Sequence, residues 1–286
     1  MVTEDEFEEH RSQLRAVAYR MLGSSADADD ALQDAWLRVS RSDTAAVENM
    51  GAWLTTVVAR VCLDQLRSRR QRREIHVPDP IISSEDGVGP EESALMADGV
   101  GLALLVVLES LSPAERLAFV LHDTFGVPFD EIASMLDRTP EAARKLASRA
   151  RQRVRGQAPE PDPDQSRQRE VVDAFFAAAR DGDFDALVSV LHPDVVLRAD
   201  GGTARPQLNL TIHGAEEVAA QARLTSQLSP FVRPVLVNGV PGVVVAPRGQ
   251  AQVVMAFTVT DGRIAAIDVL ADPERLAGLE LSTLID

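Results

Sequence analysis

Cysteine is nearly absent from this chain: Cys62 is the only one among 286 residues, so no intramolecular disulfide can form. A chain without disulfides is typical of a reducing compartment. The longest apolar run, residues 100–108, is far shorter than the roughly 20 residues that cross a bilayer. The first ten residues are acidic, whereas a secretory signal is basic and then apolar. We therefore expect a cytoplasmic protein that is neither secreted nor held in a membrane.

Positive charge is also scarce, since 29 basic residues stand against 44 acidic ones and the net charge is −15. Spread evenly, such a charge would repel the phosphates of nucleic acid. It is not spread evenly: residues 74–100 hold seven acids and no Lys or Arg, and residues 157–286 hold 18 acids against ten bases. Leu66–Arg73 (LRSRRQRR) has five arginines and no acid, and Arg138–Arg155 has a single acid, Glu141. Two short segments are therefore strongly basic within an acidic chain.

The spacing of apolar residues predicts helices first and a mixed domain afterwards. We expect helices over 6–22, which Gly23 ends, over 25–41 with Ser25 as its cap, and over about 51–73. A second helical block covers about 95–155. Beyond residue 166, two helices precede a series of β-type runs, at 195–198, 207–212, 232–238, 243–246, 250–260 and 264–270. This order indicates an α+β domain with an antiparallel sheet.

Two segments have the composition of linkers. Residues 74–95 contain three prolines and two glycines, and residues 157–166 alternate proline with acidic residues. We therefore predict a helical domain over 1–73, an acidic linker over 74–95, a second helical domain over 96–156, a short linker over 157–166 and an α+β domain over 167–286.

Residues 129–155 have the pattern of a helix-turn-helix. Phe129–Leu136 forms a short helix, Asp137 tolerates the tight turn, and Thr139 caps a second helix that starts at Pro140. The outward positions of the second helix are mostly basic, as a DNA-reading helix requires. Taken alone, a solvated basic face on an ordinary helix explains these residues about equally well.

Three segments together resemble a known family. SADADDALQDAWLRV (25–39), AWLTTVVARVCLDQLRSRRQR (52–72) and LSPAERLAFVLHDTFGVPFDEIASMLDRTPEAARKLASRARQRV (111–154) resemble conserved regions 2 and 4 of extracytoplasmic-function sigma factors. The tail, 157–286, resembles the SnoaL-like extension of their SigJ-like subfamily. The resemblance implies two all-α sigma domains, a region 2 bundle and a region 4 helix-turn-helix, plus an α+β SnoaL-like (nuclear-transport-factor-like) cone.

The resemblance also implies partners, core RNA polymerase (its β′ clamp and β subunit) and promoter DNA. Asp34, Trp36 and Leu37 would bind the β′ clamp, although Trp36 also fits a core position. Asn49, Met50 and Trp53 would surround an unstacked base of the −10 element. Backbone phosphates there would be held by Arg60, Arg67, Arg69 and Arg70. The −35 element would be read by Thr139, Arg144, Lys145, Ser148 and Arg149.

The acidic linker has two interpretations. In the family it threads toward the polymerase active-site cleft, where the seven negative charges of residues 74–100 would mimic phosphates. The charges would equally well keep a connector extended and soluble.

Three subfamily motifs recur in altered form in the linker and the tail. The linker motif is matched by His76, Pro78, Asp79 and Pro80, and the tail motifs by Asp200, Gly201, Gly202, Asp272 and Pro273. We hypothesise that the tail packs against the sigma domains and the linker and restrains them in the free protein.

Catalysis by the tail is disfavoured. Residues 157–286 contain no Tyr, Lys, Trp or Cys, which leaves His192, His213, Asp194, Asp200 and Asp268 as candidate acids and bases. We expect no enzyme activity, no metal and no cofactor, while a pocket ligand stays possible. The main alternative is a stand-alone helix-turn-helix regulator that senses a small molecule through its tail, and a DNA-tethered enzyme comes third.

Overall fold

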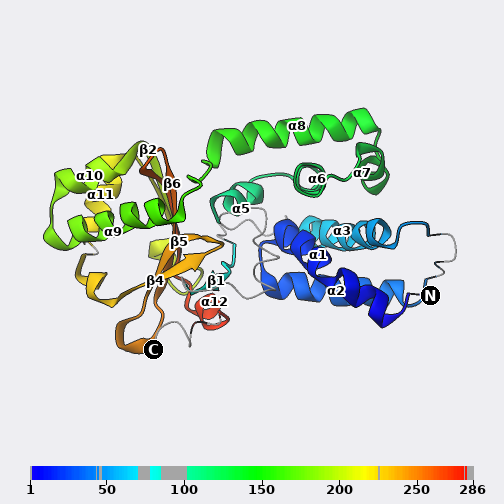
Figure 1. Ribbon diagram of the computed structural model, residues 1–286, viewed down its shortest axis with the longest axis horizontal. Coiled ribbons are helices and arrows are strands. Elements are labelled where there is room, and N and C mark those ends of the chain that lie inside the picture. Colours follow the sequence, from blue (N-terminus) through cyan, green and yellow to red (C-terminus); the bar gives the residue numbers. More distant parts are fainter. Residues whose placement is uncertain are drawn as a thin grey trace. The chain divides into compact units, whose positions relative to one another are not determined.

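The computed structural model describes residues 2–42, 44, 47–69, 78–84, 102–224, 226–279 and 281. The chain divides into two compact units (Figure 1). The helical unit comprises Met1–Glu74, Pro90–Asp98 and Val107–Gln157, and the sheet unit comprises Ile75–Gly89, Gly99–Val106 and Ala158–Asp286. The described part of the acidic linker, residues 78–84, therefore groups with the tail.

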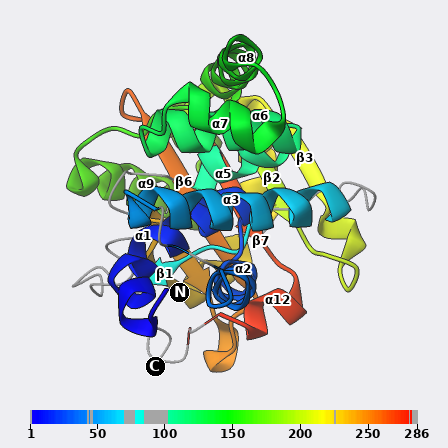
Figure 2. The ribbon, with the colours of Figure 1, turned by 90° about the vertical axis from the view of Figure 1, so that its right-hand side faces the viewer.

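Three helices form the first part of the helical unit and pack side by side (Figures 1 and 2). They are α1 (Glu4–Leu22), α2 (Ser25–Val39) and α3 (Met50–Arg69). Gly23 ends α1 in the left-handed region, at φ 76°, as the sequence predicts. The predicted cap of α2 is wrong by one residue: Ser24 accepts from the N–H of Asp27, and Ser25 is the first helical residue.

The second part of the helical unit holds the helix-turn-helix. Its elements are α5 (Leu102–Glu109), whose first five residues belong to the sheet unit, α6 (Pro113–Phe119), the π-helical turn η1 (Val120–Thr124), α7 (Phe129–Leu136) and α8 (Pro140–Gln157). Asp137 follows α7 at φ 52°, ψ 49°, because the chain must turn tightly before α8. Both helices start where the sequence predicts.

Two buried arginines join the parts of the helical unit. Arg20 of α1 is 1% exposed and Arg116 of α6 is 2% exposed. The Nε of Arg116 donates to the backbone oxygen of Arg20 at 3.2 Å, and its Nη1 lies 2.5 Å from the carboxylate of Glu109. The guanidinium of Arg20 lies 4.9 Å from the centre of the Phe125 ring. These contacts connect α1 with the helices that lead into the helix-turn-helix.

The sheet unit contains a seven-stranded sheet in the order β1-β4-β5-β6-β7-β2-β3. Its strands are β1 (Ile82–Ser83), β2 (Leu191–Asp200), β3 (Leu210–His213), β4 (Val232–Val237), β5 (Val240–Val245), β6 (Val253–Thr260) and β7 (Arg263–Leu270). The predicted antiparallel sheet is wrong for one pair, because β2 and β7 run parallel. The chain crosses from β3, at one edge, to β4, which lies next to β1 at the other edge. Strands β4 to β7 then return as a meander, which ends with β7 parallel to β2. The predicted strand at 207–212 also starts late, since Pro206–Leu208 forms a 3₁₀ turn.

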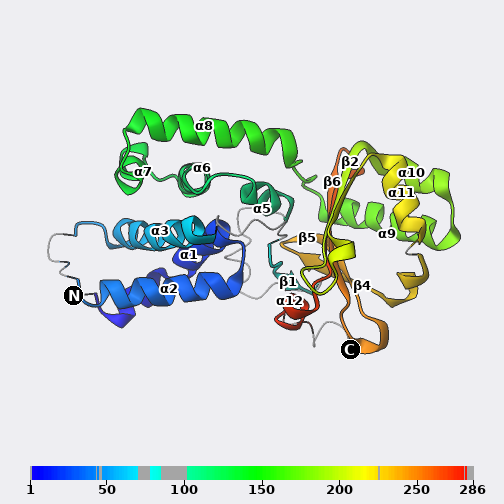
Figure 3. The ribbon, with the colours of Figure 1, turned by 180° about the vertical axis from the view of Figure 1, so that it is seen from behind.

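Three helices cover one face of this sheet (Figures 1 and 3). They are α9 (Gln165–Asp181), α10 (Phe184–Val190) and α11 (Ala215–Leu224), of which the sequence did not predict α11. The rings of Phe175 and Phe176 lie 5.8 and 5.7 Å from that of Phe257, which is fully buried. A last short helix, α12 (Pro273–Ala277), follows β7.

Both predicted linkers are partly bound to the sheet. β1 lies in the acidic linker and pairs antiparallel with β4, with Ile82 opposite Val237. In the second linker, the N–H of Asp162 donates to Val259, and its carboxylate accepts from the N–H groups of Asp261 and Gly262, both at 2.9 Å. No helix in the described ranges is long and apolar enough to cross a membrane.

Candidate nucleic-acid interface and linker clasp

Helix α8, the second helix of the helix-turn-helix, has buried alanines on one face and exposed basic residues on the other. Ala143, Ala147 and Ala150 are all fully buried, and the hydroxyl of Thr139 accepts from the N–H of Ala142 at 3.3 Å. The five residues that the sequence predicts for −35 contact are all exposed, namely Thr139, Arg144, Lys145, Ser148 and Arg149. The fold therefore presents these side chains together on one helix.

Other arginines of α8 are held by neighbouring elements. Arg151 is half-buried and forms an ion pair with Asp123 of η1. Arg153 lies 3.3 Å from the carboxylate of Glu115, which also accepts from the backbone and hydroxyl of Ser112. Burial would raise the pKa of Glu115, but the hydrogen bonds from Ser112 and the charge of Arg153 outweigh it and lower that pKa.

The predicted polymerase-binding residues lie on α2. Asp34 is exposed, and Leu37 is 50% exposed. Trp36 is half-buried, and its ring lies 5.4 Å from that of Phe7. Trp36 is thus partly a core residue, while Asp34 and Leu37 are free to contact a partner.

The predicted −10 residues lie at the start and along the length of α3. Asn49, Met50 and Trp53 fall within one helical turn, and the Oδ1 of Asn49 accepts from the N–H of Ala52 at 3.0 Å. Arg60 and Arg67 are exposed farther along the helix. The side chain of Arg69 and the whole of Arg70 lie outside the described residues. The structure therefore brings the first three together and spaces the arginines along α3.

Arg275 of α12 connects the linker with the tail. Its Nε donates to Asp79 at 2.6 Å, and its Nη1 donates to Asp200 at 2.8 Å. The side chain of Asp200 is 3% exposed and that of Arg275 is 17% exposed. A carboxylate buried to that degree requires a paired cation. We call Asp79, Arg275 and Asp200 the linker clasp.

The three altered motifs meet at this clasp. Gly202 has φ +60°, its N–H donates to Asp200 at 2.9 Å, and a Cβ at this position would overlap the carboxylate of Asp272. Asp272 in turn caps α12, which begins at Pro273. Pro78 and Pro80 are buried on either side of Asp79, Gly201 donates its N–H to Asn209 at 2.7 Å, and His76 lies outside the described residues.

Sequence reasoning missed two residues that hold the linker. Arg275 lies three residues after Asp272 of the last tail motif and was not predicted as a contact, although the buried Asp200 requires a cation. The second residue is Asn238, at φ 52°, whose N–H donates to Ile81 at 2.7 Å and whose Oδ1 accepts from the N–H of Ile81 at 3.1 Å. These two bonds fix the start of β1 on the turn between β4 and β5.

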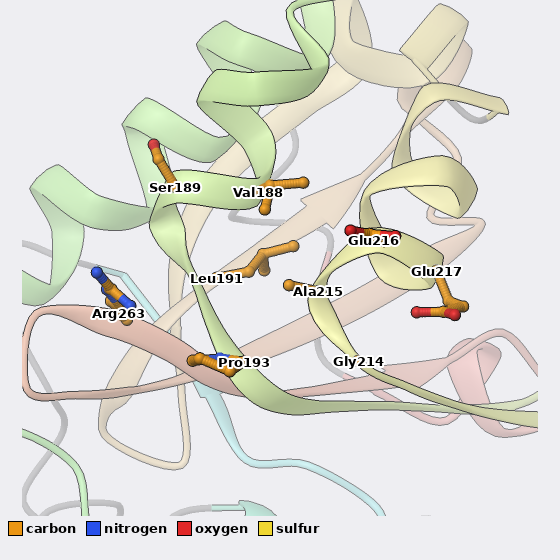
Figure 4. Close-up of a pocket in the computed structure, with 9 residues that line it drawn as sticks. All are labelled: Val188, Ser189, Leu191, Pro193, Gly214, Ala215, Glu216, Glu217 and Arg263. Atoms are coloured by element: carbon orange, nitrogen blue, oxygen red, sulfur yellow. The ribbon is translucent and has the colours of Figure 1, made fainter.

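The tail has an open depression of about 520 Å³ between α10, β2, α11 and β7 (Figure 4). It is lined by Val188, Ser189, Leu191, Pro193, Gly214, Ala215, Glu216, Glu217 and Arg263.

None of the five candidate acids and bases is among these described lining residues. The Nδ1 of His192 accepts from the N–H of Asp194 at 3.1 Å. Asp268 is buried 2.9 Å from Arg198, and burial raises the pKa of Asp268 although Arg198 opposes it. The five candidate acids and bases thus do not gather at this depression.

Family models match both halves of the helical unit. The model of sigma-70 region 2 matches residues 7–72, and that of sigma-70 region 4 matches residues 101–154. The chain is 39% identical over 293 residues to the ECF RNA polymerase sigma factor SigJ of Mycobacterium tuberculosis, covering 96% of this chain and 94% of that one. The chain belongs to the extracytoplasmic-function sigma factors. It therefore binds core RNA polymerase and promoter DNA.

Two further comparisons cover the tail of this sigma factor as well. The probable ECF sigma factor SigI of the same species is 33% identical over 274 residues, which are 93% of this chain and 92% of that one. The crystal structure of M. tuberculosis SigJ matches with a TM-score of 0.78 at 36% identity, over 98% of this chain and all of the other. The predicted fold class, two helical sigma domains and an α+β tail, is confirmed. The alternative of a stand-alone regulator gains no support from them.

Proposed function

We propose that this sigma factor directs polymerase to promoters with −10 and −35 elements and that its tail, 167–286, restrains it before it binds polymerase. Asp34, Trp36 and Leu37 would bind the β′ clamp, α3 would bind the −10 element, and α8 would read the −35 element. The tail is in this proposal a regulatory domain without catalytic activity.

Exposure and charge support the DNA-binding surfaces. Arg60 and Arg67 on α3, and Lys145 and Arg149 on α8, are exposed cations on helices whose opposite faces are buried. Such cations release counterions from DNA, which makes affinity fall with salt. The exposed Leu37 supports a protein partner, because a half-exposed leucine beside a half-buried tryptophan gains burial on docking.

The linker clasp is the observation on which the regulatory proposal rests. Residues 78–84 are held by Arg275, by Asn238 and by pairing of β1 with β4. The family resemblance assigns the linker to the polymerase cleft. A segment cannot be a sheet strand and enter the cleft at the same time, so the tail competes with polymerase for the linker. Binding to polymerase would thus require the clasp to open.

Run-off transcription with purified core polymerase tests both parts of the proposal. The full chain is compared with residues 1–157, which end at the last residue of α8. The proposal predicts promoter-specific transcripts from both proteins, and more transcript from the shorter chain when core polymerase is limiting. Equal activity at all core concentrations would contradict restraint by the tail, and absence of specific transcripts from both would contradict the promoter-directing role.

A further inference from the structure

The turn before the helix-turn-helix has an uncommon geometry. Val120–Thr124 forms the π-helical turn η1, which is followed by hydrogen bonds from Gly126 to His122 at 3.1 Å and from Val127 to Leu121 at 2.9 Å. π-helical turns are rare and frequently occur at functional sites. This turn places His122 and Asp123 next to each other, and each contacts a residue of the helix-turn-helix.

His122 fixes an aromatic ring at the start of α7. Its ring stacks on that of Phe129, with centres 3.8 Å apart and planes 30° apart. The Nδ1 of His122 lies 3.1 Å from the backbone oxygen of Val127, so the imidazole is itself held. The Phe129 ring therefore has a defined position before any partner arrives.

The guanidinium of Arg144, on the recognition helix, lies over this ring. Its central carbon is 5.6 Å from the centre of Phe129, within the range of a cation–π contact. Its Nη1 is also 3.9 Å from the carboxylate of Glu141, one turn earlier. The Arg144 side chain is nevertheless 55% exposed. It is thus held on one side and open to solvent on another.

Besides the link from His122 through Phe129 to Arg144, the turn η1 contacts α8 through Asp123. It pairs with Arg151, seven residues after Arg144 and therefore on the same face of the helix. This ion pair joins η1 to α8 directly, while His122 of the same turn contacts the Phe129 ring that lies against Arg144. His122, through Phe129, and Asp123, through Arg151, thus both contact the face of α8 that carries Arg144.

We propose that Phe129 is a positioning residue for promoter recognition, which holds Arg144 in the orientation that reads a base of the −35 element. An arginine forms its two parallel hydrogen bonds to guanine only when its planar group is correctly oriented. An arginine that is already oriented loses less rotamer freedom on binding. This inference rests on the −35 role proposed above for α8.

Holoenzyme assembled from the full chain tests the inference on a promoter library with randomised −35 elements. Arg144→Ala is expected to reduce the preference at one base pair about tenfold. Phe129→Leu, which keeps apolar volume but removes the π face, is expected to reduce the same preference about threefold. Phe129→Tyr keeps the ring and should keep the wild-type preference. In the Arg144→Ala background, Phe129→Leu should have no further effect on it.

Base preference is a ratio between promoters, so a variant that merely lowers the fraction of folded protein leaves it unchanged. An unchanged preference in Phe129→Leu, or an equal effect of Phe129→Leu with and without Arg144, would overturn the positioning role while leaving the role of α8 intact. If Arg144→Ala alters neither affinity nor preference, the proposed −35 role of this residue fails, and the positioning inference fails with it.

Discussion

The guanidinium of Arg275 donates to the carboxylate of Asp79, 196 residues earlier in the chain, over 2.6 Å. Arg275 also pairs with Asp200, so one side chain joins an acid of the linker to an acid of the tail. Asp79 is the more exposed of the two, at 26% against 3%. The Asp200 pair is therefore the inner part of the clasp, and the Asp79 pair is the part that can open without leaving a buried charge unpaired.

Opening the clasp from the linker side should increase activity. Asp79→Asn removes the charge that binds Arg275 but keeps the Arg275–Asp200 pair, so the tail should stay folded. We expect an exposed or half-buried ion pair of this kind to contribute about 1 kcal/mol, which corresponds to roughly fivefold in the equilibrium for linker release. Run-off transcription at limiting core polymerase should rise accordingly.

Asp173→Asn is the matched control for this change. Asp173 is exposed on α9 of the same unit, and its loss alters the net charge by the same amount. An equal rise for both variants would show that the charge of the tail, and not the clasp, restrains the factor.

Leu37 should contribute to polymerase binding but not to folding. Leu37→Ala is expected to weaken affinity for core polymerase about tenfold, since truncation of an interface anchor typically costs more than 1 kcal/mol. Leu224→Ala is the control, because Leu224 is 74% exposed and lies on the tail. Biolayer interferometry with immobilised core measures both. Equal affinities for the wild type and Leu37→Ala would remove α2 from the proposed interface.

Gly202 should tolerate no side chain. Gly202→Ala combines a positive φ with an overlap against Asp272, so we expect a loss of roughly 2–4 kcal/mol in the free energy of unfolding. Gly182→Ala has a similar φ, +69°, with no atom within 4 Å of the new Cβ, and should lose only about 1 kcal/mol. Urea unfolding of the full chain measures both. Similar losses of unfolding free energy in the two variants would mean that Asp272 moves aside and leaves room for the Cβ at position 202.

The carboxylate of Glu115 should make the helical unit sensitive to acid. Its pKa in the folded protein lies below the ordinary value of 4.5, so the unfolded chain takes up its proton first as the pH falls. The stabilisation is therefore complete above pH 4.5 and is lost as the pH falls through the folded pKa. Glu115→Gln should lose roughly 1–3 kcal/mol at neutral pH, and its difference from the wild type should shrink in acid. A difference that is constant with pH would contradict this account.

Local signals in the sequence predicted the helical unit well. The capped start at Thr139 and the tight turn at Asp137 depend on residues within four positions of each other, so the sequence contains the whole cause. The exposure of Arg144 and Lys145 follows in the same way from the helical period. These features required no knowledge of distant parts of the chain.

The sheet unit was less predictable because its decisive contacts are distant in sequence. Only two residues of the linker form β1, and nothing in Ile82–Ser83 indicates that Leu236 and Val237 are their partners. The parallel pairing of β2 with β7 likewise depends on where the chain crosses the sheet. Arg275 follows a proline on a short helix, and only the buried position of Asp200 shows that this cation was required.

The attachment of residues 160–162 to the turn between β6 and β7 leaves only a short connection between α8 and the tail. Ala158 and Pro159 alone separate Gln157, the end of α8, from Glu160, whose backbone oxygen accepts from Thr260 at 2.6 Å. Three peptide links span at most about 11 Å. If α8 reads the −35 element as proposed, the tail therefore stays at the same promoter. Any molecule that acts on the tail would then act on the assembled initiation complex as well as on the free factor.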